Sequence, residues 1–196
     1  MNTYKIIGII IYLSFYGSYF AKMFSQSKSG IKTDRMGKGI KPKKTFVIEV
    51  ILKMITLMTA VIQLISILFI KKILILIQKD WFIYSGFIIS TIGVIIFIIA
   101  MVTMHDSWRA GIDNTQDTKM ISNGIYKYSR NPAFVGFDLF YIGLALSFSN
   151  VFNVFFACAS IVMFHFQILE EEKFLNTIFG NEYLDYKKKT WRYFGK

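Results

Sequence analysis

A short polar segment beside an apolar run carries side chains that could bind an anion. Arg130 is followed by Asn131 and Pro132. Pro132 suits the first turn of a helix, where its missing N–H costs little, and Asn131 suits the cap before it. Arg130 would then lie beside the positive N-terminus of a helix. These two positive features together predict an anionic group nearby, such as a carboxylate.

A second polar cluster, Glu170, Glu171 and Glu172, directly follows the last long apolar run. Such carboxylates either form a solvated helix end or aim one carboxylate at a cationic or hydroxyl-bearing ligand, and residue types alone leave both open. Apolar residues then recur at helical spacing over 174–179. We therefore expect a helix there that ends at Gly180 as a C-cap.

Five apolar runs must position these clusters. The chain has 196 residues, of which 54% are hydrophobic and 18% charged, with one cysteine. This composition excludes a disordered chain and a disulfide framework. A bilayer core needs about 20 mostly apolar residues per helix, and the candidate runs are roughly 4–21, 45–70, 81–104, 133–149 and 151–169.

The predicted fold class is an all-α membrane protein with about five transmembrane helices. We expect one integral membrane domain over residues 1–196, in which 1–104 forms three helices. Residues 105–196 form the remainder, with a pocket built from the 105–134 loop and the C-terminal tail. The fourth and fifth runs meet at Ser149 and Asn150, which predicts a tight helical hairpin.

The distribution of basic residues predicts the orientation. Five alternating helices place eighteen Lys and Arg residues on one side and four on the other, with Lys53 inside a helix. Basic loops favour the cytoplasmic side, so the N-terminus is expected outside and the polar clusters in the cytoplasm. This asymmetry accounts for the net charge of +11 without nucleic acid as a partner.

Two sites of charge fall inside the apolar runs. Glu49 and Lys53 stand four residues apart, a spacing that favours an ion pair on one helix face. Asp138, two turns into the fourth run, either lines a cavity or bonds a neighbouring helix, because ionisable groups at membrane depth usually face the protein interior.

The polar segments resemble those of the isoprenylcysteine carboxyl methyltransferase and phospholipid methyltransferase family of integral membrane enzymes. The resemblance spans about residues 105–194, and the three N-terminal helices match only in number and hydropathy. The segments that carry it are SWRAGID (107–113), NGIYKYSRNPAFVG (123–136), GLAL (143–146), EEEKFL (170–175), FGNEYLDY (179–186) and WRYF (191–194).

The resemblance implies S-adenosylmethionine as cofactor, with sites carried over by position. The implied cofactor-binding residues are Thr118, Lys119, Met120, Ile121, Tyr126, Asn131, Pro132, Ala133, Phe134 and Glu171. The candidate catalytic residues are Arg130, Glu172 and Arg192, and the candidate substrate-binding residues are Gln167, Asp138 and Trp108. No metal site is expected. Glu170, Glu172, Asp138 and His165 remain alternatives for a base.

The sequence departs from the family pattern at three positions. Asn131 stands where the commonest motif has His, and Phe134 where it has Tyr; many prokaryotic relatives resemble this variant. Gln167 stands where the prenyl-protein enzymes have an Arg that meets the substrate, which weakens the case for a prenylcysteine carboxylate.

The expected activity is methyl transfer to a lipophilic, membrane-soluble acceptor. The acceptor is an isoprenylcysteine-like carboxylate, a phospholipid amine or a thiol. The alternatives are an NADPH-dependent membrane reductase of the sterol-reductase type and a non-enzymatic membrane protein that keeps the fold. A glycine-rich strand-to-helix loop is missing from the sequence, which argues against a soluble Rossmann methyltransferase.

Overall fold

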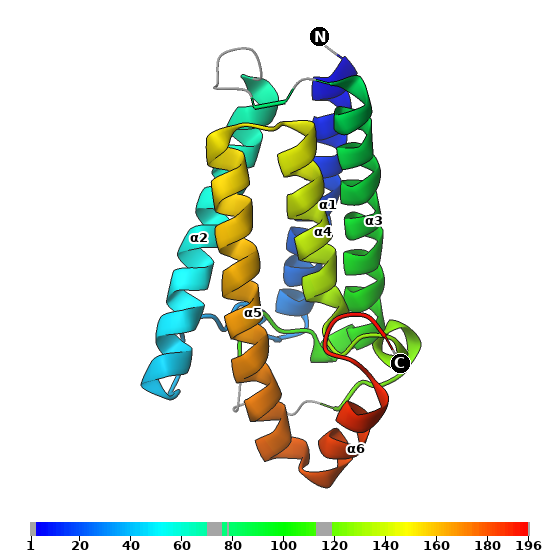
Figure 1. Ribbon diagram of the computed structural model, residues 1–196. Coiled ribbons are helices and arrows are strands. Elements are labelled where there is room, and N and C mark those ends of the chain that lie inside the picture. The colour runs from blue at the N-terminus through cyan, green and yellow to red at the C-terminus, as the bar shows by residue number, and fades with distance from the viewer. Residues whose placement is uncertain (1–2, 70–75, 78, 113–118, 196) are drawn as a thin grey trace.

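A computed structural model describes residues 3–69, 76–77, 79–112 and 119–195. All the long elements in this part of the chain are helices (Figure 1). The six α-helices are α1 (Thr3–Lys28), α2 (Lys43–Leu68), α3 (Asp80–Met104), α4 (Pro132–Ser147), α5 (Val151–Phe179) and α6 (Asn181–Lys189). Two 3₁₀ turns, η1 (His105–Ser107) and η2 (Gly124–Lys127), lie between α3 and α4. The all-α prediction is confirmed for the described residues.

Among the described residues, four helices are long and apolar enough to cross a membrane: α1, α2, α3 and α5. The fourth predicted span is a shorter apolar helix of 16 residues, α4. At 1.5 Å per residue it is about 24 Å long, which is less than the roughly 30 Å of a bilayer core. Large side chains such as Leu57 and Phe155, 62% and 64% exposed, cover the outside of the bundle, as expected of a lipid-facing surface.

Glycines bring α3 and α4 into backbone contact. Gly86 and Gly93 on α3 face Gly143 and Gly136 on α4, in each case one heptad apart. A Cβ added at Gly143 would lie 2.3 Å from Ser90 N and 2.5 Å from Gly86 O. Small residues allow this close approach in membranes, where dispersion and polar contacts hold helices together. This pair of helices is the rigid frame that carries the loop between them.

Aromatic rings fill the space between this pair and α1. Phe15 of α1 stacks on Phe140 of α4, with ring centroids 3.9 Å apart and planes at 7°. Phe97 and Phe137 complete the cluster at 4.6 and 4.9 Å from Phe15. The Phe97 and Phe137 contacts lie in the usual range of aromatic centroid distances, and the stacked Phe15–Phe140 pair is closer still, so α1 is fixed against the frame.

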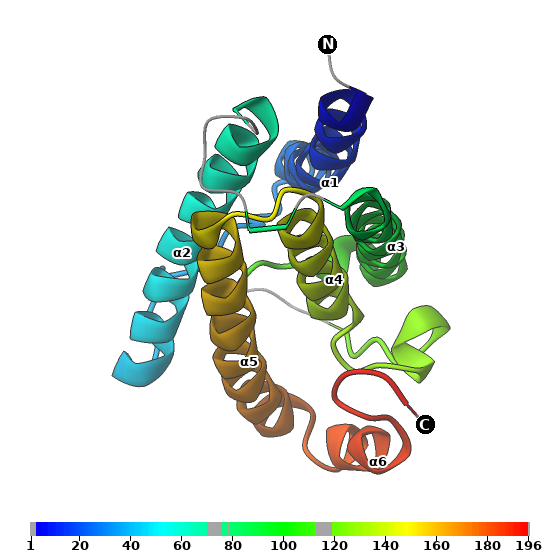
Figure 2. The same cartoon turned by 45° about the horizontal axis from the view of Figure 1, so that its top comes forward.

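Helix α2 lies along α5 on the other side of the bundle (Figure 2). Thr59 of α2 and Ser160 of α5 share a buried hydrogen bond of 2.8 Å. The α4–α5 turn is as tight as predicted, since α4 ends at Ser147 and α5 begins at Val151. Asn150 caps α5 by accepting from Asn153 N at 3.0 Å and donates to Ser66 Oγ at 2.8 Å.

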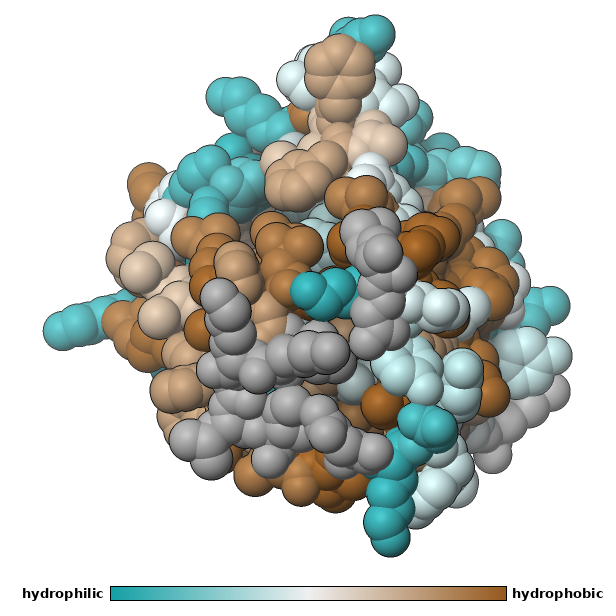
Figure 3. Space-filling view, turned by 90° about the horizontal axis from the view of Figure 1, so that it is seen from above, coloured by the Kyte–Doolittle hydropathy of each residue, from teal (hydrophilic) through white to brown (hydrophobic). Residues whose placement is uncertain are grey.

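The two ends of the bundle differ. Brown, apolar side chains occupy much of the end that carries the α4–α5 turn (Figure 3). At the opposite end α5 runs past the ends of α3 and α4, and α6 folds back beneath them (Figure 1). Gly180, at φ 49°, ends α5 as predicted. The extension of α5 carries the predicted carboxylates to the polar end.

Candidate active site

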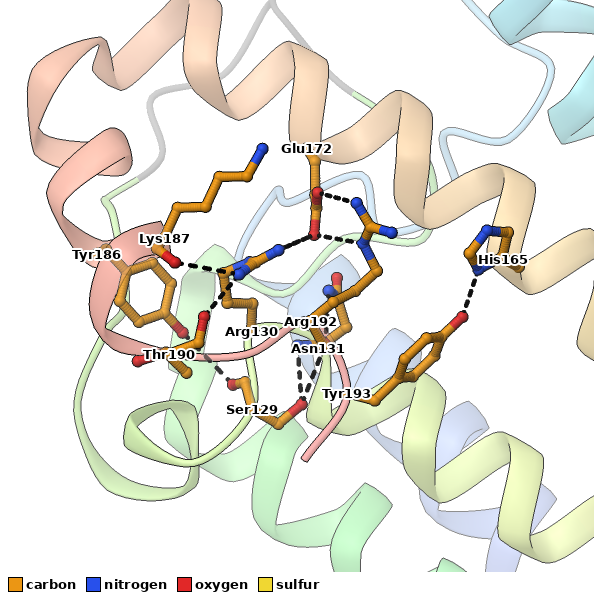
Figure 4. Close-up of polar contacts among 10 residues, drawn as sticks. All are labelled: Ser129, Arg130, Asn131, His165, Glu172, Tyr186, Lys187, Thr190, Arg192 and Tyr193. Carbon is orange, nitrogen blue, oxygen red and sulfur yellow. Dashed lines mark hydrogen bonds and ion pairs between the residues drawn. The ribbon is translucent and has the colours of Figure 1, made fainter. Parts of the chain in front are cut away.

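Glu172 of α5 lies between two arginines. Its Oε1 accepts from Arg130 Nη2 at 2.7 Å and from Arg192 Nε at 3.0 Å, and its Oε2 accepts from Arg192 Nη2 at 2.9 Å (Figure 4). The Glu172 side chain is 6% exposed and that of Arg130 is 7% exposed. The anion that the Arg130 motif predicted is therefore a carboxylate of this chain, and all three candidate catalytic residues meet in one cluster.

The segment around Arg130 also holds the C-terminal tail in place by hydrogen bonds. Arg130 Nη1 donates to Thr190 O at 2.6 Å, and its backbone N–H donates to Trp191 O at 2.9 Å. Asn131 Nδ2 donates to Arg192 O at 3.0 Å. Asn131 is the residue before α4, but its side chain does not cap the helix. The predicted cap is wrong because the amide is used to hold the tail.

The charges in this cluster compensate one another. The hydrogen bond to Glu172 raises the pKa of Arg192 above its usual value. Charge-assisted bonds of this kind strongly favour the ionised carboxylate. Glu172 is therefore suited to holding Arg130 and Arg192 in place and poorly suited to accepting a proton.

Glu171 points to a different group of residues. Gln167 Nε2 donates to Glu171 Oε1 at 2.9 Å, while Gln167 Oε1 is buried and has no hydrogen-bond partner in the described part of the chain. Tyr126 on η2 is 6% exposed, and its pKa is raised by burial, by Tyr186 and by the charge of Glu171. Tyr186 in turn donates its hydroxyl to Tyr126 O at 2.6 Å. Glu171, Gln167 and Tyr126 thus share one buried region.

The remaining cofactor candidates line the loop and the start of α4. Lys119 N donates to Ser107 Oγ at 3.5 Å, and Met120 and Ile121 are half-buried. Phe134 contacts Phe164 with ring centroids 5.5 Å apart. Pro132 and Ala133 are buried at the first turn of α4, whereas the predicted contact at Thr118 lies outside the described residues.

Like Gln167, the other two candidate substrate residues have a buried polar atom without a hydrogen-bond partner among the described residues. Trp108 is 6% exposed and packs on Phe97, but its Nε1 has no hydrogen-bond partner. Asp138 Oδ1 on α4 is also buried without a partner. A buried polar atom without a partner costs free energy. A bound molecule that supplies an acceptor or a donor would remove this cost.

The sequence placed Glu49 inside an apolar run but did not predict that this buried carboxylate joins two loops. Glu49 is 0% exposed and accepts from Gly37 N and Ile112 N, each at 2.8 Å, and from Lys41 Nζ at 2.5 Å. The expected pair with Lys53 is wrong, because Lys53 reaches Asp34 Oδ2 at 2.6 Å instead. Helical spacing predicts only contacts between neighbours on one helix. Here the donors to Glu49 come from two loops instead.

The neighbouring loops are also paired through their backbones. Arg35 N donates to Ala110 O at 2.8 Å, and Ala110 N donates to Thr33 O at 2.9 Å. Gln26, 2% exposed at the end of α1, donates to Trp108 O at 3.2 Å. The N-terminal helices therefore fix the segment that carries Trp108.

We expect Glu49→Gln to lower the free energy of unfolding by about 2 kcal/mol, because hydrogen bonds to a charged group are worth about 1.5–3 kcal/mol. Thermal or denaturant unfolding in detergent, followed by circular dichroism, measures it. Lys53→Met is the control. The Lys53 side chain is 46% exposed, so its ion pair with Asp34 should contribute less than about 1 kcal/mol to stability. Equal effects of the two variants would contradict the role given to Glu49.

Comparison with known proteins decides the family. Residues 81–182 match the phospholipid methyltransferase family, which is more than half of the chain. The chain belongs to the phospholipid methyltransferase family. The matched region starts at the beginning of α3, earlier than the segments that carry the resemblance, and it ends in α6. The tail with Arg192 lies beyond it.

Relatives in this family include protein-S-isoprenylcysteine O-methyltransferases. The Dictyostelium discoideum protein is 30% identical over 111 residues, which cover 55% of this chain and 47% of the relative. A probable enzyme of this name from Oryza sativa subsp. indica is 31% identical over 118 residues (57% and 61%). The Xenopus laevis protein is 31% identical over 115 residues (57% and 40%). The matches thus span about half the length of these relatives.

Proposed function

We propose that this protein is a methyltransferase that uses S-adenosylmethionine to methylate a lipophilic acceptor in the membrane. The observation that carries the proposal is the hydrogen-bonded pair of half-buried Glu171 and buried Gln167 near Tyr126, in which Gln167 Oε1 has no partner among the described residues. It occurs in a member of the phospholipid methyltransferase family, whose description and relatives' names both include methyl transfer.

The residues present fit the cofactor. Glu171 can hold ribose hydroxyls or the cofactor's ammonium group, and the free Gln167 Oε1 can accept a further N–H or O–H. The rings of Tyr126 and Phe134 can stack on adenine or attract the sulfonium by a cation–π interaction. The backbone of Lys119, with Met120 and Ile121, can bond the adenine edge. When bound, the cofactor supplies an electrophilic methyl group on a positively charged sulfur.

Arg130 takes a different part from the one that its motif implies. Its donors already reach Glu172 and carbonyls of the tail, so it acts as a positioning residue. Together with Asn131, Glu172 and Arg192 it holds the tail across the start of α4. A segment held across a site in this way excludes water from it and keeps its reacting groups aligned.

The acceptor is proposed to arrive from the bilayer. The helices expose apolar side chains to lipid, and the polar cluster lies where α3 ends and α4 begins. An isoprenylcysteine-like carboxylate, as the relatives' names suggest, is one candidate, and a phospholipid amine or a thiol are others. Asp138, Trp108 and Gln167 are the proposed substrate contacts.

The proposed topology has one domain and a cytoplasmic site. The basic residues concentrate in the loops at the polar end, and the positive-inside rule places that end in the cytoplasm. The cofactor would then enter from the cytoplasm, while the acceptor enters sideways from lipid.

Calorimetry on the purified protein in detergent tests the cofactor. We expect saturable binding of S-adenosylmethionine and of its demethylated product, and none of NADPH. Glu171→Ala should raise the dissociation constants about tenfold to hundredfold, because a charge-assisted hydrogen bond is worth about 1.5–3 kcal/mol. Glu182→Ala, exposed on α6, is the control and should bind normally. Binding of NADPH alone would favour a reductase, and a folded protein that binds none of these molecules would refute the proposal.

A further inference from the structure

Two of the four candidate bases are already used by the fold. Glu172 is held by two arginines. Glu170 Oε2 accepts from Thr45 Oγ1, and its Oε1 accepts from Lys173 Nζ, each at 2.8 Å. Carboxylates with cationic partners are weak proton acceptors. His165 and Asp138 are therefore left.

His165 is oriented by the tail. Its Nδ1 lies 2.6 Å from the hydroxyl of Tyr193, and the two rings stack at 18° with centroids 6.1 Å apart (Figure 4). Tyr193 directly follows Arg192, whose double contact with Glu172 fixes this part of the tail. Within the described part of the chain, no hydrogen bond reaches His165 Nε2. The ring is half-buried and therefore accessible from one side.

Asp138 of α4 is a titratable neighbour of this pair. The pKa of Tyr193 is raised by burial and by Asp138, with Arg192 opposing and Glu172 adding to the increase. The titratable and charged neighbours of the pair are Asp138 on α4, Glu172 on α5 and Arg192 in the tail. Among the described residues, Asp138 Oδ1 is buried and has no hydrogen-bond partner.

We propose that His165 is the proton acceptor of the reaction, positioned by Tyr193, and that the acceptor substrate is a nucleophile that must lose a proton. The inference rests on the proposed methyltransferase activity. With Nδ1–H donating to the Tyr193 hydroxyl, Nε2 presents a lone pair, as a general base requires.

The lone pair of an amine nitrogen or a thiol sulfur forms a bond to the methyl carbon, and the carbon–sulfonium bond breaks with its electron pair remaining on that sulfur. The proton of the nucleophile moves to His165 Nε2, which becomes an imidazolium. A carboxylate acceptor has no proton to lose, so it does not need this group.

Labelled methyl transfer measured over a range of pH tests the proposal. The probes are phosphatidylethanolamine vesicles for an amine, farnesyl thiol for a thiol and N-acetyl-S-farnesylcysteine for a carboxylate. We expect His165→Ala to bind the demethylated cofactor normally and to lose about 100-fold in kcat on the amine or the thiol, in the range typical of general bases. Added imidazole should restore part of the rate.

Two further variants separate a proton-transfer role from a structural one. Tyr193→Phe should lower kcat less and shift the pH at which the rate rises. His105→Asn changes the other histidine of the chain and should behave as the unaltered protein. Transfer to the carboxylate alone, to none of the probes, or an His165→Ala loss that imidazole does not rescue would overturn the proposal. If the unaltered protein binds no S-adenosylmethionine, the methyltransferase activity itself is refuted.

Discussion

Glu172→Ala is expected to lower the free energy of unfolding by about 3–5 kcal/mol, the cost of removing one partner from a buried ion pair. The change leaves Arg130, with a 7%-exposed side chain, without its carboxylate, and it removes both contacts of Arg192. The tail loses its attachment to α5, so Tyr193 no longer reaches His165. Methyl transfer should fall below detection, and the tail should become sensitive to protease.

Asp185→Asn is the matched control for this variant. Asp185 pairs with Lys188 at 2.9 Å, but the two side chains are 64% and 75% exposed. Exposed pairs contribute about 0–1 kcal/mol. Denaturant titration in detergent measures both variants. A loss of stability in Glu172→Ala no larger than in Asp185→Asn would show that the two arginines find other partners, and would contradict the positioning role of Glu172.

Gly143→Ala is expected to destabilise the fold by about 3 kcal/mol or more, at or above the upper end of usual overpacking costs. The added methyl group would meet Ser90 N at 2.3 Å and Gly86 O at 2.5 Å. Both atoms belong to the backbone of α3, so no side chain can turn away. Helices α3 and α4 must separate, and the loop between them carries Arg130 and Tyr126 away from α5.

Gly17→Ala adds the same methyl group, but it is not expected to destabilise the fold. Nothing lies within 4 Å of a Cβ at Gly17 in α1. Alanine is favoured over glycine inside a helix by about 1 kcal/mol, so this variant should unfold at the same or a slightly higher temperature. Thermal unfolding of the two variants side by side measures the difference. Equal melting temperatures would mean that α3 and α4 tolerate separation.

The sequence predicted the helical elements well because lipid imposes a strong local rule. Every run of about 20 apolar residues must satisfy its backbone internally, and a helix does so within the run. The bounds of α3, the tight α4–α5 turn and the Gly180 cap follow from this rule and from turn chemistry. The apolar run that forms α4 is the shortest of the five in the sequence, and α4 is the shortest of the apolar helices in the structure.

The partners of individual charges did not follow from the sequence. Arg130 predicted an anion, but nothing in its spacing named Glu172, 42 residues away. Helical spacing favoured Lys53 as the partner of Glu49, whereas Lys41 and two loop N–H groups bind it. Long side chains and loop backbones reach across elements, and which of them meet depends on packing distances of a few ångströms.

The sequence by itself determined the class of protein, the number of apolar runs and the segments in which the chemistry lies. Each depends on composition or on contacts within a few residues. Only the tertiary structure decided that Glu172 neutralises both arginines and that Glu171 points to Gln167 and Tyr126 instead. It also decided that His165 is oriented by Tyr193. Neighbouring carboxylates on one helix point in different directions, so adjacent residues of the same type acquire different partners once α4, α5 and the tail have packed.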